Sequence, residues 1–211
     1  MKKIMFNDKY GLTQAVLEGR KTMTRRVISY PSKFRGQNVA GYYVCRKPSG
    51  ELVEVCLHDE DERMIDAGQI FPNFQVGEVV AIAQSYKDSG YTPDSLDRHP
   101  KDLSIRGLMK DSAGWNNKMF VKSYACKHHI KITNIKVERL QEISDDDCLK
   151  EGIFEWNAGQ KDIPFYSFSY ADIPDYFSPR DAFADLIDKV SGKGTWEENP
   201  FVWVYEFKLF D

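Results

Sequence analysis

The segment from Gly19 to Arg26 gathers two hydroxyls, one lysine and three arginines within eight positions. A lysine close to several fixed positive charges has its protonated form disfavoured, so its pKa falls and the amine becomes partly neutral near pH 7. A neutral Lys21 would take a proton from the Thr24 hydroxyl or from water, as in hydrolases that pair an amine with a serine or threonine. The alternative interpretation is a basic strand whose charges are only solvated, because short basic runs are common.

The elements that would position this segment follow from spacing and capping residues. Asn7 or Asp8 can cap a short helix whose apolar residues recur at helical spacing, and Gly19 ends that helix. Residues 22–28 are then expected to be extended. The sequence therefore predicts a helix, a glycine turn and a strand around the candidate residues.

The faces of that strand set a geometric condition on the chemistry. On a regular strand, residues three apart point to opposite faces, so Lys21 must lie in the turn before the strand, or a bulge must intervene, if it is to share a pocket with Thr24. The same alternation groups Arg26 with Thr22 and Thr24 at the pocket. It leaves Arg25 on the other face, where we expect it at the surface.

The remaining pattern predicts an α+β fold, a small mixed β-barrel with short peripheral helices, in a single domain over 1–211. A change in alternation at Thr133-Asn134 predicts a β-bulge. Polar or irregular composition predicts two large loop insertions, near 87–117 and 154–177. The other expected elements are strands at 3–6, 39–46, 52–57, 79–84, 129–140 and 201–210, and helices at 145–151 and 179–191.

Bulk composition narrows the classes of function. The 211 residues carry a net charge of −3, which argues against wrapping a long polyanion but allows a local basic pocket for a nucleoside or a short RNA end. The N-terminus lacks the apolar stretch of a signal peptide, and no apolar run is long enough to span a membrane. The four cysteines show no CxxC spacing, so reduced thiols in the cytoplasm are expected. Cys126-x-His128-His129 has no second ligand pair, so neither a metal nor a cofactor is expected.

Four blocks occur in an order that resembles the ASCH domain family, a PUA-like β-barrel superfamily. The first is the Gly19–Arg26 segment after a short helix, and the others are 76–80, 132–153 and 196–207. The last two blocks are similar to those of the long phage and prophage members. The resemblance implies a PUA-like barrel in a bacterial or prophage protein, with a modified nucleoside or short RNA as partner.

The resemblance also implies an activity. One compact bacterial branch of the family hydrolyses N(4)-acetylcytidine to cytidine and acetate with a Lys, a Thr and a Glu, which correspond to Lys21, Thr24 and Glu151. In that reaction Lys21 would be the base, Thr24 the nucleophile or the residue that positions water, and Glu151 the acid for the leaving amine or the group that orients the substrate. Arg26 would stabilise negative charge, and Thr22 would contact the substrate. The compact branch lacks both of the insertions predicted above.

Two other functions remain open from the sequence. The first is a non-catalytic RNA-binding module, because residues 118–136 contain five lysines and no acids and could form a basic stripe with Arg20 to Arg26. The second is a ribonuclease, for which the adjacent His128 and His129 are the only histidine pair. Eight aromatic residues within 154–177 would either stack on a base or anchor the insertion to the core. The oligomeric state stays open.

Overall fold

The fold is built on a five-stranded sheet. It was obtained as a computed structural model, which describes residues 1–46, 53–90, 115–156, 164–169 and 176–210. The innermost pairs are antiparallel, and β1 alone runs parallel to its neighbour β8. In sheet order the strands are β1 (Lys3–Ile4), β8 (Val79–Ile82), β9 (His129–Arg139), β12 (Phe201–Leu209) and β2 (Met23–Val27).

The strand β12 is the centre of the core. It lies between β9 and β2, and residues on both of its faces are buried, as Val204 and Tyr205 show. Its pairing with β9 shifts register, because Glu206 lies opposite Asn134 whereas Phe207 lies opposite Ile132. Thr133 is therefore the extra residue of a β-bulge, which confirms the bulge predicted from the change in alternation.

The helices begin and end at residues that the sequence marks. Asn7 caps a 3₁₀ turn (Asp8–Tyr10), α1 (Leu12–Leu17) follows, and Gly19 takes a left-handed φ of 73° that an L side chain would strain. Ser144 and Ser178 accept hydrogen bonds from main-chain N–H groups at the starts of their helices. The other helices are α2 (Tyr86–Ser89), α4 (Asp145–Lys150), α5 (Pro179–Ser191) and α6 (Thr195–Glu198).

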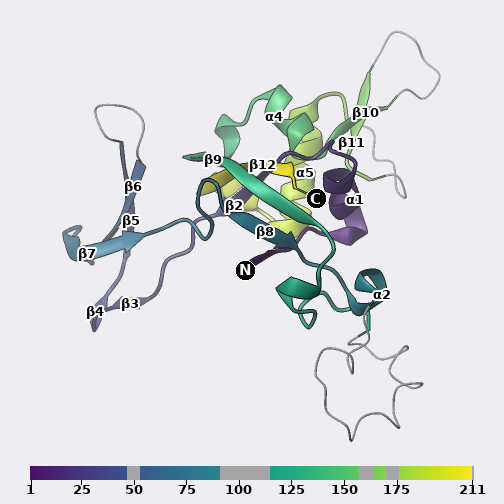
Figure 1. The fold of residues 1–211 in the computed structure, drawn as a ribbon. Helices are drawn as coiled ribbons and strands as arrows, with labels where there is room; N and C mark the ends of the chain where they lie inside the picture. The colour runs from purple at the N-terminus through teal and green to yellow at the C-terminus, as the bar shows by residue number, and fades with distance from the viewer. Residues whose placement is uncertain (47–52, 91–114, 157–163, 170–175, 211) are drawn as a thin grey trace, which may run out of the picture.

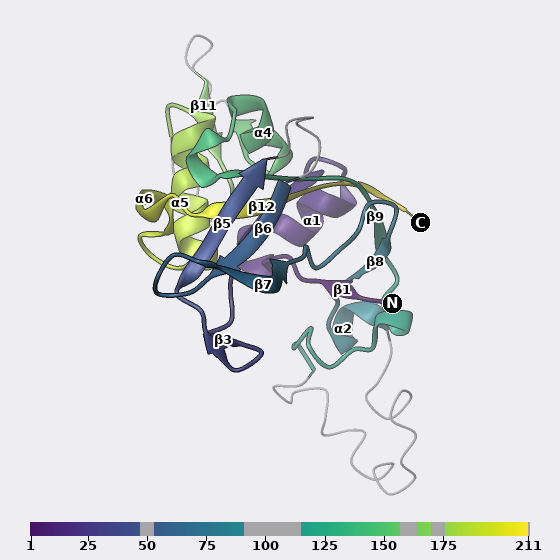
Figure 2. The same cartoon turned by 90° about the vertical axis from the view of Figure 1, so that its left-hand side faces the viewer.

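A second, three-stranded antiparallel sheet lies beside the first (Figures 1 and 2). It consists of β5 (Gly41–Arg46), β6 (Val53–His58) and β7 (Met64–Ile70), so the predicted hairpin is confirmed, while its turn lies outside the described residues. The buried side chains of Val55 and Leu57 face inward. A short hairpin, β3 (Lys33–Phe34) and β4 (Gln37–Asn38), precedes this sheet.

The structure is thus α+β. Within its described parts the sheets do not close into a barrel, because β1 and β2 are the two edges of the main sheet. Most of the insertion predicted near 87–117 lies outside the described residues. The insertion near 154–177 contains an antiparallel pair, β10 (Phe154–Trp156) and β11 (Phe165–Ser167), where an irregular segment was predicted. None of the helices in the described residues combines the length and apolarity needed to cross a bilayer.

Candidate functional site

A cavity of about 610 Å³ lies between the two edges of the main sheet. One wall is the segment that follows β1, including Met5 and Phe6, and another is the start of β2. Arg26 bridges the two edges, because its Nη2 donates to the carbonyl oxygen of Met5 at 2.5 Å. A third wall is the apolar stripe of α5, which includes Phe183 and Leu186. The cavity is large enough for a nucleoside-sized ligand.

Lys21 lies in the turn before β2, as the shared pocket requires. Its main-chain N–H donates to the carbonyl oxygen of Ala15 at 2.9 Å, so the chain turns sharply after α1. The side chain is only 2 % exposed, and its Nζ donates to both the Oε2 and the main-chain oxygen of Glu151, each at 2.6 Å. Burial lowers the pKa of Lys21, and Glu151 opposes part of that shift. The cause predicted from sequence, repulsion by neighbouring arginines, is therefore secondary to burial.

Glu151 is positioned by the end of α4. It is the C-cap of that helix, and its own N–H donates to the carbonyl oxygen of Asp147. Gly152 follows with a left-handed φ of 104°, which ends the helix and places its backbone against the Lys21 side chain. The carboxylate is 5 % exposed and holds Lys21 on one oxygen and Arg25 on the other. Glu151 is therefore not a solvated glutamate, although it lies at a helix end.

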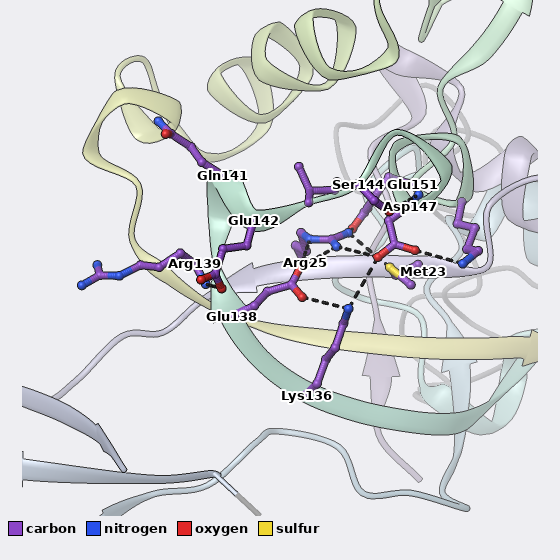
Figure 3. Close-up of polar contacts among 12 residues, drawn as sticks. Met23, Arg25, Lys136, Glu138, Arg139, Gln141, Glu142, Ser144, Asp147 and Glu151 are labelled. Carbon is purple, nitrogen blue, oxygen red and sulfur yellow. Dashed lines mark hydrogen bonds and ion pairs between the residues drawn. The ribbon is translucent and has the colours of Figure 1, made fainter. Parts of the chain in front are cut away.

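Arg25 is the most deeply buried charge of the site, contrary to the surface position expected for it. Its side chain is 0 % exposed and contacts three carboxylates (Figure 3). Its Nη2 lies 2.6 Å from Glu138 Oε1 and 3.2 Å from Asp147 Oδ2, and its Nη1 lies 3.1 Å from Glu151 Oε1. Burial acts to lower the pKa of Arg25, but Glu151 and Glu138 outweigh it, so the pKa is raised. Strand alternation separated Arg25 from Thr24 but could not show that α4 covers the Arg25 side chain.

The cations around this network complete its charge balance. Lys136 reaches Glu138 Oε2 at 2.8 Å and Asp147 Oδ2 at 3.5 Å, and Lys150 reaches Asp147 Oδ1 at 2.9 Å (Figure 3). Burial acts to raise the pKa of Asp147, but Lys150, Lys136 and Arg25 together hold it below its usual value. The network therefore ties β2, β9 and α4 together and fixes the carboxylate that faces Lys21.

Of the three residues that alternation placed at the pocket, Thr24 and Arg26 line the cavity and Thr22 does not. Thr24 is 5 % exposed and lines the cavity, and Arg26 lines it with a more exposed side chain. Thr22 is half-buried and is not among the residues that line the cavity. No hydrogen bond joins Lys21 to Thr24 in the part of the chain that the structure describes.

Three of the five lysines in the predicted basic stripe have partners on the protein. Lys118 forms an ion pair with Asp8 at 2.5 Å and also donates to Thr13 Oγ1. Lys127 donates to the main-chain oxygen of Asp88, and Lys136 belongs to the carboxylate network. Among the described residues, no cluster of three or more His, Cys, Asp or Glu side chains could hold a metal ion.

Several site residues carry no clear signal in the sequence. Glu138 lies on the long strand β9, on a face whose polar residues are typical of a strand that faces solvent. Asp147 belongs to a run of three acids at the start of α4, and acids are common there because they interact favourably with the helix N-terminus. Its sequence position therefore gave no reason to expect the contact with Arg25. No protein-family model, curated protein sequence or solved structure matches this chain. The geometry of the cavity is therefore the basis for a functional proposal.

Proposed function

We propose that the cavity binds a modified pyrimidine nucleoside and that the protein hydrolyses an acyl amide on the exocyclic nitrogen of that nucleoside. The observation that supports this proposal is that the fold brings distant residues into one cavity. Lys21 and Glu151 lie 130 positions apart in the sequence and are in direct contact. Both line the cavity, together with Thr24 and Arg26. These are the residues that the resemblance to the ASCH family nominates. Amide hydrolysis needs a base, an acid for the leaving amine and a donor for the developing oxyanion, and the cavity wall holds one group suited to each.

In this proposal, side-chain donors that the protein itself does not use would donate hydrogen bonds to the oxyanion. Among the described residues, the Thr24 hydroxyl has no hydrogen-bond partner although the residue is almost fully buried. Lys21 directs two N–H groups to Glu151, and the third N–H that it gains when it accepts a proton can donate to the oxyanion. Arg26 uses one donor on Met5. Donors that are already fixed around a cavity stabilise charge in the transition state without reorganising.

The Lys21–Glu151 pair supplies the proton transfers in this proposal. Burial lowers the pKa of Lys21, so its neutral amine can accept a proton from the attacking water, and the 2.6 Å contact with Glu151 holds that amine in place. The pair then returns that proton to the exocyclic nitrogen as the C–N bond breaks, giving a carboxylic acid and the free amine. Arg25 holds the Glu151 carboxylate in place, so Glu151 acts by orienting Lys21.

The same proposal includes a PUA-like barrel of the ASCH type. The support for it is the approach of β1 and β2, the two edges of the sheet, which Arg26 joins through Met5. A barrel that is left open at one seam would hold its ligand in that seam, and the cavity lies there.

The test is the release of cytidine from N(4)-acetylcytidine by the purified protein, followed by chromatography. Thr24→Val removes the hydroxyl and breaks no ion pair, and we expect it to lower the turnover rate by about 100-fold or more. Thr22→Val is the matched control, because Thr22 lies next to the site but not in the cavity wall, and it should retain the parent rate. Absence of turnover by the folded parent would reject the hydrolase proposal, and salt-dependent RNA binding in its place would favour the RNA-binding alternative.

A further inference from the structure

The main chain of β2 has a free edge at Arg25. The ladder between β2 and β12 uses alternate residues: the C=O of Thr22 accepts from the N–H of Phe207, and the N–H of Ile28 donates to the C=O of Phe201. In an antiparallel pair, the residues between such bonded positions direct their N–H and C=O groups away from the partner strand. Arg25 is one of these, so its main-chain donor and acceptor point toward the open edge of the sheet.

The exposure of Arg25 places these two groups in the cavity wall. The whole residue is 4 % exposed, whereas its side chain is 0 % exposed, so its accessible surface belongs to the main chain. Arg25 also lines the cavity, although its guanidinium is enclosed by carboxylates. In the described parts of the chain, neither its N–H nor its C=O has a hydrogen-bond partner.

A main-chain donor and acceptor that have no protein partner and open into a cavity are available to a ligand or water. More than nine in ten main-chain groups that are shielded from water are paired, so a ligand that excludes water from this edge must satisfy both groups. The N–H and C=O of one strand residue lie side by side, so they fit a molecule that presents an acceptor next to a donor. The ring N3 and the exocyclic N4–H of a cytosine have this arrangement, and one N4–H remains when N4 carries an acyl group.

We propose that the main chain of Arg25 reads the pyrimidine base: its N–H donates to ring N3, and its C=O accepts from N4–H. This inference rests on the proposed function for the class of ligand. The two hydrogen bonds bring the exocyclic nitrogen to the cavity wall that also holds Lys21 and Thr24. They select a base by its hydrogen-bonding edge and leave the side chains free for the reaction.

Amide hydrogen exchange, measured by NMR on the full chain with and without cytidine, tests this inference directly. In the free protein the N–H of Arg25 should exchange at least about tenfold faster than those of Thr24 and Arg26, which bond to β12. Saturating cytidine should slow the exchange of Arg25 by about tenfold. Val27 is the internal control, because it lies on the same free edge but is exposed, and its exchange should not change.

Ligand analogues supply the second measurement. The ribonucleoside of 2-pyrimidinone keeps the ring and N3 but lacks the N4 donor, so it should bind about tenfold more weakly than cytidine. The inference is overturned if Arg25 is already as protected as Thr24 in the free protein, if bound cytidine leaves its exchange unchanged, or if cytidine shows no saturable binding up to about 10 mM.

The two proposals fail in different ways. Slowed exchange at Arg25 without turnover of N(4)-acetylcytidine would keep the recognition of the base and reject the hydrolase. Turnover with unchanged exchange at Arg25 would keep the hydrolase and reject the recognition by the main chain.

Discussion

Replacing Arg25 by methionine should destabilise the protein strongly. The substitution keeps an unbranched chain of similar length but removes the cation that faces Glu138, Asp147 and Glu151. Each of these carboxylates also has another cation, yet all three would lose the group that lies between them. An ion pair that is broken inside a protein leaves an uncompensated buried charge, and this is more costly than the loss of the attraction itself.

The magnitude follows from the burial of the partners. Exposed ion pairs contribute about 1 kcal/mol or less, whereas breaking a buried one costs about 3–5 kcal/mol. The Arg25 side chain is 0 % exposed and its three partners are 5–13 % exposed, so the larger range applies. In a domain of this size 1 kcal/mol corresponds to about 2–4 °C, so the midpoint of thermal unfolding should fall by about 6–20 °C.

The assay is equilibrium unfolding in urea, followed by circular dichroism, with a thermal scan of the same samples. Arg20→Met is the matched control, because the ion pair of Arg20 with Glu18 lies at the surface, and its loss should cost about 1 kcal/mol or less. Arg25→Lys keeps the charge but cannot span three carboxylates, so its stability should lie between those of the parent and Arg25→Met.

A loss below about 1 kcal/mol for Arg25→Met would refute this reasoning. It would mean that water reaches the carboxylates in the folded protein and replaces the guanidinium. Equal losses for the methionine variants of Arg25 and Arg20 would have the same meaning, because burial would then make no difference to the two pairs.

Three further predictions concern α4 and the cysteines. The partners of Asp147 hold its pKa below the usual value, so its contribution to stability is present above about pH 4 and is lost as pH falls through the lowered pKa. Urea unfolding of Asp147→Asn should therefore differ most from the parent at pH 7, the difference should shrink as pH falls below about 4, and a constant difference would contradict this. Ser144→Ala removes the cap of α4 and should cost about 1 kcal/mol in the same assay, whereas no change would mean that the cap bond is not formed in solution. Burial raises the pKa of Cys148 to about 12, so iodoacetamide followed by mass spectrometry should label the exposed Cys45 in the folded protein and Cys148 only after unfolding.

The sequence predicted the features that are set by near neighbours. Asn7 and Ser144 cap helices because their side chains accept from N–H groups two or three residues away. The bulge at Thr133 follows from a change in alternation that can be read in one strand. Such features depend on local backbone preferences, so a single sequence contains most of the information that determines them.

The burial of Arg25 could not be predicted in the same way. Alternation separates the two faces of β2 but does not show what covers each face. The partners of Arg25 lie 113 to 126 positions further along the chain, on β9 and α4, and their approach depends on the pairing of the whole sheet. Only the resemblance to a family implied that Lys21 and Glu151 belong to one site, because a glutamate at a helix end is usually solvated; their direct contact was not predicted.

The order of the strands has a consequence for how the protein is made. In the described structure the strand β2 pairs only with β12, which lies more than 170 residues further along the chain, so β2 leaves the ribosome well before its partner. At about 5–20 residues per second, the segment that carries Lys21 and Thr24 waits roughly 9–35 s for its partner strand. During that interval β2 has no partner strand, so the arginine and threonine side chains of this segment are exposed to solvent and to other molecules. The site therefore forms only when β12 joins β2 to the rest of the sheet.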